Sequence, residues 1–212
     1  VLDAGAMALT VKESEVADML RGLAAKPALV ITDSQAVREV AAAVPEDIRL
    51  TTFSTLFARY KGDFAAQLAG AAAIDTLKDG DRVLIAEGCS HHVTCDDIGR
   101  VKIPNWMKKY TGRELKFEWT QGADFPDNLE DYALVVHCGG CMLNRAEVRR
   151  RINECARQGV KVTNYGIVIS KMQGVLERVV KGIADAGATG SVSATGSISD
   201  TGSISDTGEE GD

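Results

Sequence analysis

Soft metal-binding side chains gather in one stretch of this sequence, between Ala86 and Met142. All three histidines and four of the five cysteines lie there, namely His91, His92, His137, Cys89, Cys95, Cys138 and Cys141. Cys138 and Cys141 have the Cys-x-x-Cys spacing with which zinc sites and iron–sulfur clusters both chelate metal. This spacing leaves three chemistries open. They are an iron–sulfur cluster, a structural zinc site closed by Cys89, Cys138, Cys141 and one histidine, and a redox dithiol of Cys138 and Cys141.

Two apolar runs must position these thiols, because Cys89 and Cys138 each follow one of them. Apart from the leading Arg82, residues 82–86 (RVLIA) and 132–136 (YALVV) are continuously apolar rather than alternating, which is typical of buried parallel strands. Open α/β sheets place their sites at the carboxyl ends of strands. If the two strands are parallel neighbours, their ends lie about 5 Å apart. The thiols of Cys89, Cys138 and Cys141 would then converge.

The wider pattern predicts an α/β fold of two small domains, with mainly parallel sheets flanked by helices and a low-complexity C-terminal tail. Further strands are expected at 28–32, 48–53, 115–119 and 160–163. Residues 1–78 read as a β-α-β-α unit, which we expect to form a homodimer that covers an exposed sheet edge or pairs helices. A turn at 78–81 marks the boundary to a cluster-binding domain over residues 79–186.

Residues 187–212 form the tail, in which GSISDT occurs at 196–201 and 202–207 after a looser GSVSAT at 190–195. The tail has too few apolar residues for a core, so we expect disorder. It also carries five acids and no base, and without it the formal charge of -6 becomes 24 bases against 25 acids, or -1. The folded body therefore has no charge bias towards nucleic acid or an anionic membrane, and we expect neither as a partner.

Cysteine usage and hydropathy predict a cytoplasmic protein. No apolar run approaches the ~20 residues of a membrane span, and we recognise no signal peptide. The cysteines are odd in number and clustered, which favours a reducing compartment over a disulfide framework. Cys155 lies within a predicted helix and is expected to be a small core residue, while Cys95 is expected to be a bystander thiol.

The longer sequence words around the thiols resemble the HydF family, the scaffold and carrier proteins of [FeFe]-hydrogenase maturation. The family's cluster signature is similar to Cys89-x-His91, then 45 residues, then His137-Cys138-x-x-Cys141. Neighbouring words also match, namely EGCSHH from Glu87, CDDIGRVKIP from Cys95, HCGGCMLN from His137 and VTNYG from Val162. LVITDSQ from Leu29 and TTFSTLFARYKGD from Thr51 extend the resemblance, which covers roughly residues 1–185.

The resemblance implies a scaffold rather than a catalyst. A [4Fe–4S] cluster would be held by Cys89, Cys138 and Cys141, while His91 and His137 match the motif's histidines and would ligate weakly or line the site. The cargo would be a diiron precursor with CO and CN ligands, delivered to apo-[FeFe]-hydrogenase. The radical SAM maturases would be further partners.

One departure from the family concerns GTP. The family normally begins with a GTP-binding domain, but this sequence has no Gly-x-x-x-x-Gly-Lys-Ser/Thr loop. We therefore expect no GTP binding by that mechanism and no enzymatic activity. The chain resembles the family's dimerisation and cluster domains alone.

Three thiolates leave the fourth iron of a cluster to another ligand. We expect that ligand to be exchangeable, since imidazole and carboxylate bind iron less tightly than thiolate and would yield to an incoming bridge. The nearby contenders are His91, Asp96 and Asp97, in no fixed order. The two acids follow Cys89 by seven and eight residues, on a loop able to fold back.

Overall fold

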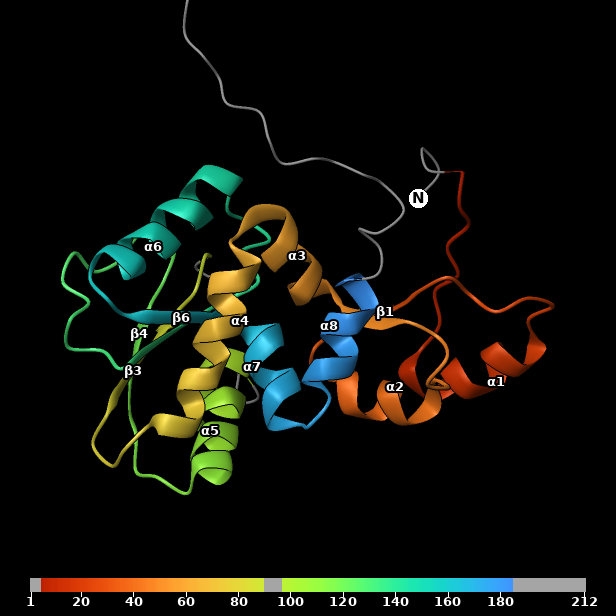
Figure 1. Cartoon of the computed structure of the whole chain (residues 1–212), viewed down its shortest axis with the longest axis horizontal. Coiled ribbons are helices and arrows are strands. Elements are labelled where there is room, and N and C mark those ends of the chain that lie inside the picture. Colours follow the sequence, from red (N-terminus) through yellow and green to blue (C-terminus); the bar gives the residue numbers. More distant parts are fainter. Residues whose placement is uncertain (1–4, 90–96, 185–212) are drawn as a thin grey trace, which may run out of the picture.

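The six strands found in the described part of the chain are all parallel and form two sheets (Figure 1). The structure, a computed structural model, describes residues 5–89 and 97–184. Within these residues, β1 (Val30–Thr32) and β2 (Leu50–Thr52) form a two-stranded sheet. The other sheet has the order β4-β3-β5-β6 and comprises β3 (Arg82–Ala86), β4 (Lys116–Thr120), β5 (Leu134–His137) and β6 (Lys161–Asn164). The predicted α/β class with parallel sheets is confirmed.

The predicted neighbour relation between the two thiol-bearing strands is also confirmed. β3 pairs with β5 in parallel, so that Ala86 lies opposite His137. The ladder continues one step further, because the Cys138 N–H donates to the Ala86 carbonyl at 2.8 Å. The segments that follow Ala86 and His137 therefore leave the sheet at the same edge.

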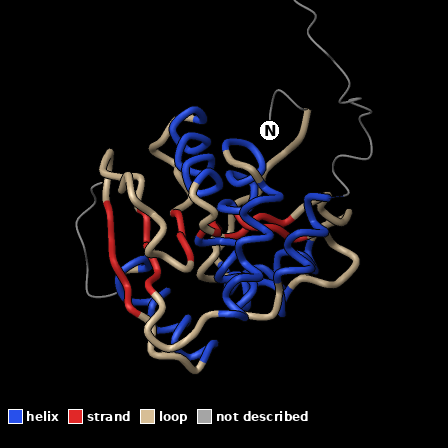
Figure 2. The backbone as a smooth tube through the Cα atoms, turned by 60° about the vertical axis from the view of Figure 1, so that its left-hand side comes forward, coloured by secondary structure: helices blue, strands red, loops and turns tan. Residues whose placement is uncertain are grey.

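Helices cover both faces of the four-stranded sheet (Figures 1 and 2). On one face, α5 (Ile103–Thr111) and α7 (Tyr165–Met172) pack on the alternating side chains that include Val83 and Val136. On the other face, α6 (Arg145–Arg157) packs on the set that includes Leu84 and Val135. This two-sided burial explains why the strands are continuously apolar.

Helix α4 (Phe64–Ala72) lies across β6, and the 3₁₀ turn η3 (Ala73–Thr76) then leads towards β3. The helix approaches the strand so closely that a Cβ on Gly70 would overlap the backbone of Val162. Glycine is therefore required at this crossing.

The two-stranded sheet is covered by helices from both ends of the chain. The 3₁₀ turn η2 (Glu13–Glu15), α1 (Val16–Gly22) and α2 (Val37–Ala43) come from the N-terminal part. Helix α8 (Leu176–Ala184) comes from the C-terminal part and crosses β2, where a Cβ on Gly182 would overlap the Leu50 carbonyl. Arg178 of α8 also donates to the carbonyls of Ala41, Val44 and Pro45, at 2.5, 2.6 and 2.8 Å.

Helices α3 (Phe53–Lys61), α4, α7 and α8 connect the two sheets (Figure 1). Thus α4, which falls in the predicted first domain, packs on the four-stranded sheet, while α8, from the predicted second domain, packs on the two-stranded one. The domain boundary at residues 78–79 stays a prediction, as does disorder of residues 187–212, which lie outside the described residues.

Two helices begin close to the carboxyl edges of the sheets. Helix α3 has Thr52 as its N-cap, which accepts from the Thr55 N–H at 3.2 Å. A π-helix η4 (Ile98–Lys102) precedes α5. Within the described ranges, every helix is too short or too polar to cross a lipid bilayer.

Candidate metal centre

Cys138 is a half-buried thiol at the carboxyl edge of the large sheet. Its sulfur accepts hydrogen bonds from the backbone N–H groups of Gly88, at 3.0 Å, and Gly140, at 3.4 Å. Gly88 follows β3 and Gly140 follows β5, so the sulfur joins the ends of both strands. Hydrogen bonds of this kind stabilise a thiolate and are used to tune sulfur ligands of metal centres.

Glycines make this arrangement possible. A Cβ on Gly88 would lie 2.8 Å from Leu143 Cγ and 3.4 Å from the Cys138 sulfur, so a larger residue would displace the N–H donor. Gly140 has a φ of 66°, in the left-handed region that favours glycine. The two donors to Cys138 therefore depend on residues without side chains.

The other two predicted cluster thiols lie in the same neighbourhood. Cys89 is half-buried and Cys141 is exposed. Burial raises the pKa of the Cys138 thiol, the Gly140 and Gly88 N–H groups lower it, and the charges of Cys89 and Cys141 raise it further. Cys89 follows β3 and Cys138 follows β5, so these two thiols come from segments that leave the same edge of the sheet, with Cys141 three residues further along.

His137 lies next to Cys138 in the chain but on the opposite face of the sheet, beneath α6. Its Nδ1–H donates to the Cys138 carbonyl at 2.7 Å, which leaves Nε2 as a buried acceptor without a hydrogen-bond partner among the described residues. Burial lowers the pKa of His137 to about 4, and the Arg151 charge adds to this effect. The ring is therefore neutral and holds the carbonyl that precedes the Gly139–Gly140 turn.

Comparison with known families decides the identity of the chain. Residues 1–62 match the hydrogen maturase F dimerization domain, and residues 65–182 match the hydrogen maturase F tetramerization domain. The chain belongs to the hydrogen maturase F family. The resemblance read from the sequence is thereby confirmed, and the family has its role in hydrogenase maturation. No curated protein matches the chain.

The three predicted thiol ligands all lie in one of the two matched regions. Cys89, Cys138 and Cys141 all lie in the hydrogen maturase F tetramerization region, as do all strands of the large sheet. The dimerization region contains β1, β2 and α3. Both regions are named for subunit association, which supports oligomerisation of this chain.

Of the three contenders for a fourth ligand, only Asp97 lies among the described residues. It is buried, and its Oδ1 accepts from the N–H groups of Gly99, at 2.9 Å, and Arg100, at 2.8 Å. Asp97 thus caps the π-helix that leads into α5. His91, Asp96 and the predicted bystander Cys95 lie outside the described residues, as does His92.

Sequence reasoning missed a buried carboxylate beside the centre. Glu87 is almost fully buried and accepts from the Gln121 amide at 3.1 Å and the Tyr165 hydroxyl at 3.4 Å, with the Arg100 guanidinium at 3.6 Å. Burial and the Glu87 charge raise the pKa of Tyr165 well above its usual value. A Cβ on Gly99 would lie 2.5 Å from the Glu87 carboxylate. The only sequence signal was a carboxylate directly after a buried strand.

Sequence reasoning also missed Lys61, which comes from the dimerization region. Its Nζ donates to the carbonyls of Gly140, Cys141 and Leu143, at 3.1, 3.2 and 2.8 Å. These carbonyls belong to the loop that carries Cys141. A lone lysine at a helix end gives no signal in the sequence, because its partners are backbone atoms 79 to 82 positions away.

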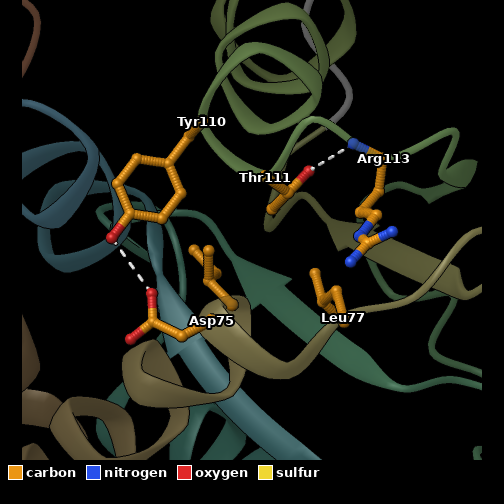
Figure 3. A pocket seen from close by; sticks show the side chains of 6 residues that line it. Asp75, Leu77, Tyr110, Thr111 and Arg113 are labelled. Carbon is orange, nitrogen blue, oxygen red and sulfur yellow. Dashed lines mark hydrogen bonds between the residues drawn. The ribbon is translucent and has the colours of Figure 1, made fainter.

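The described residues contain no group of three His, Cys, Asp or Glu side chains arranged to hold a single metal ion. A small pocket of about 290 Å³ lies elsewhere, between η3 and the end of α5 (Figure 3). There the Asp75 carboxylate accepts from the Tyr110 hydroxyl at 3.0 Å and from Lys171 at 2.8 Å, and Lys171 lowers the pKa of Asp75. These polar groups satisfy one another, and we assign the pocket no function.

Proposed function

We propose that this chain is an iron–sulfur scaffold and carrier in [FeFe]-hydrogenase maturation. Cys89, Cys138 and Cys141 hold a [4Fe–4S] cluster, and a diiron precursor with CO and CN ligands is the cargo delivered to apo-[FeFe]-hydrogenase. The observation that carries the proposal is the Cys138 sulfur. It accepts two backbone hydrogen bonds from residues that follow β3 and β5, at the carboxyl edge of a parallel sheet.

The donor set fits a cluster held by three protein ligands. Cys89 and Cys138 follow neighbouring strands and Cys141 comes three residues later, while the neighbouring histidine His137 is directed to the other face of the sheet. A tetrahedral zinc site would instead use one of the other histidines as its fourth protein ligand. A [4Fe–4S] cluster accepts three thiolates and leaves one iron to an exchangeable ligand. Bound to these thiols, it would supply that open iron.

The fourth ligand is proposed to be exchangeable, with His91, Asp96 and Asp97 as contenders. Asp97 already caps the π-helix through Oδ1, so binding iron would compete with the start of η4 and α5. This argument favours Asp96 and His91 over Asp97. We propose that His137 serves the site by fixing the Cys138 carbonyl, rather than by binding iron strongly.

The proposed carrier is a cytoplasmic homodimer, with apo-[FeFe]-hydrogenase and the radical SAM maturases as further partners. β1 is an edge strand of the two-stranded sheet, and Ile31 on it is 40% exposed. Pairing of this edge with a second copy would satisfy its backbone groups. Neither nucleic acid nor membrane is proposed as a partner, and the two matched regions are proposed to be non-catalytic.

Anaerobic reconstitution with iron and sulfide tests the function. Iron and sulfide analysis with EPR is expected to give about four irons per chain, and Cys89→Ser, Cys138→Ser and Cys141→Ser are each expected to lose the cluster. Cys155→Ala is the matched control, because Cys155 is buried in the core and burial raises its pKa to about 12. A colourless protein with bound zinc, or a metal-free reversible dithiol, would instead favour the structural zinc site or the redox dithiol.

The fourth ligand needs its own comparison. His91→Ala, Asp96→Ala and Asp97→Ala are compared by EPR before and after addition of cyanide or imidazole. The proposal predicts that Asp96→Ala or His91→Ala changes the spectrum and its response to added ligand. Asp97→Ala is expected mainly to lower thermal stability. Three unaltered spectra would exclude all three contenders.

A further inference from the structure

Lys61 makes contacts that the proposed cluster site does not yet explain. A lysine ammonium has three N–H donors and no acceptor. In Lys61 these donors meet three carbonyl oxygens, those of Gly140, Cys141 and Leu143. All three acceptors belong to one short loop of the tetramerization region, whereas Lys61 ends a helix of the dimerization region.

The ammonium is held in place from its own helix. Phe57 lies one turn before Lys61, and the ammonium sits 5.0 Å from the centre of its ring. The start of the helix is capped by Thr52, and its end is packed tightly, because a Cβ on Gly62 would lie 3.3 Å from Ile152 of α6. The position of the charge is therefore set by the fold and is not left to a freely moving side chain.

The carbonyls of the loop favour a cation at this point. Three carbonyl dipoles directed at one point repel one another, and a positive charge between them offsets that repulsion. The same loop contains the left-handed Gly140, whose N–H donates to the Cys138 sulfur, and the exposed Cys141. A change in the loop backbone would therefore alter both a sulfur hydrogen bond and the location of a predicted ligand.

We propose that Lys61 is a positioning residue of the metal centre. Its ammonium holds the Gly140–Leu143 backbone in the conformation that keeps Cys141 near Cys138, and it places a positive charge beside a site rich in thiolate. The second part rests on the proposed cluster-binding function, while the first concerns the metal-free protein as well. The consequence is that the dimerization region shapes a site built by the tetramerization region.

The metal-free full chain tests the positioning role. Lys61→Met removes the charge and donors while keeping the length of the side chain. Lys171→Met is the matched control, because Lys171 is a partly buried lysine whose partner, Asp75, lies away from the thiols. Loss of charge-assisted hydrogen bonds is expected to speed hydrogen exchange of the Gly140 amide about tenfold. The rate at which iodoacetamide alkylates Cys141, measured by mass spectrometry, is expected to differ from wild type in Lys61→Met and not in Lys171→Met.

Unchanged exchange and alkylation in Lys61→Met, or equal changes in Lys171→Met, would overturn the positioning role. Circular dichroism of both variants checks that the fold is intact. If the wild-type chain binds no iron, the proposed function fails, but the metal-free measurements still decide the role of Lys61.

The reconstituted protein tests the electrostatic role. A positive charge near the cluster favours its more reduced, more negative state, so Lys61→Met is expected to lower the midpoint potential measured by an EPR-monitored redox titration. Lys61→Arg keeps the charge and is expected to restore the potential. A potential that is the same in wild type and Lys61→Met would overturn this part of the proposal.

Discussion

The carboxyl edges of the two parallel sheets end in different side chains. Beyond β3 and β5 come the thiols of Cys89 and Cys138, whereas hydroxyls stand at and beyond the ends of β1 and β2. There the Ser34 hydroxyl donates to the Ser54 hydroxyl at 3.1 Å. The two edges adjoin, since the Asn164 amide at the end of β6 donates to the Ser54 carbonyl at 2.9 Å.

The same parallel topology thus carries two kinds of side chain at its carboxyl edges. At the large sheet, the edge carries thiols, and that of Cys138 accepts hydrogen bonds from two backbone donors. At the small sheet, the hydroxyls bond to each other and to helix starts, as Thr52 does with Thr55. We infer that the first edge is available for a ligand and that the second closes the junction between the sheets.

The largest expected effect separates the two edges by metal content. Cys138→Ala removes a proposed ligand and is expected to abolish cluster retention after anaerobic reconstitution, as measured by iron and sulfide per chain. Ser54→Ala removes a hydroxyl hydrogen bond at the other edge and is expected to keep the iron, at a cost of about 1 kcal/mol in the free energy of unfolding. Loss of iron in Ser54→Ala alone would reverse the comparison.

A second prediction concerns the close packing at the junction between the two sheets. A Cβ on Gly166 would overlap Ser54 and lie 2.9 Å from the Ser34 hydroxyl, so Gly166→Ala is expected to cost about 2–4 kcal/mol in urea unfolding. Gly22→Ala is the control, because no atom lies within 4 Å of the added Cβ on α1. It is expected to be neutral or stabilising by up to about 1 kcal/mol. Equal costs in the two variants would show that the junction is not tightly packed.

A third prediction concerns the cover of the small sheet. Arg178→Met deprives three carbonyls near the end of α2 of their donor and is expected to cost about 2 kcal/mol, measured by thermal and urea unfolding. Arg21→Met is the control, because the Arg21 side chain is 72% exposed and pairs with Asp18 on its own helix. An Arg178→Met cost no larger than that of Arg21→Met would mean that α8 is held by apolar packing alone.

The smallest expected effect depends on pH. Hydrogen bonds from Arg150 and Arg151 lower the pKa of Glu147 on α6 to about 2. A lowered carboxyl pKa stabilises the fold above the unfolded value of about 4.5, and this contribution is lost as the pH falls towards 2. Because Glu147 is partly exposed, we expect Glu147→Gln to remove only about 1 kcal/mol of that acid sensitivity.

The control for this pH effect is Asp47→Asn, which removes an exposed partner of Lys26 beside the small sheet. Lys26 lowers the pKa of Asp47, so the sign of the pH dependence is the same. Urea unfolding between pH 2 and pH 5 compares the two variants with wild type. A larger change in Asp47→Asn than in Glu147→Gln would contradict the expected order.

Buried strands were the most predictable part of the fold. Arg82–Ala86 is a strand with the predicted bounds, since the four residues after Arg82 are apolar, as in a buried parallel strand. Asn144 caps α6 by accepting from the Glu147 N–H at 2.8 Å, and asparagine is a preferred residue at this position. These features depend on neighbouring residues, so the sequence contains their signal.

The remaining features depend on contacts between distant residues. The pairing of Glu87 with Tyr165 and Arg100 arises only after β3, α7 and η4 have come together. Strand alternation alone predicts that His137 and Cys138 lie on opposite faces of the sheet. The burial of His137 beneath α6 could be seen only in the structure. Lys61 meets backbone carbonyls, which any residue type provides, so no pattern in the sequence points to it.

The crossing of α8 over β2 has a consequence for how the chain folds during synthesis. Leu50 is fully buried, and the helix that packs on its backbone is the last element of the described fold. A ribosome releases the N-terminal part first, so β1 and β2 emerge well before the helix that covers them. The small sheet would therefore wait, incompletely covered, until the thiol-bearing half has been translated.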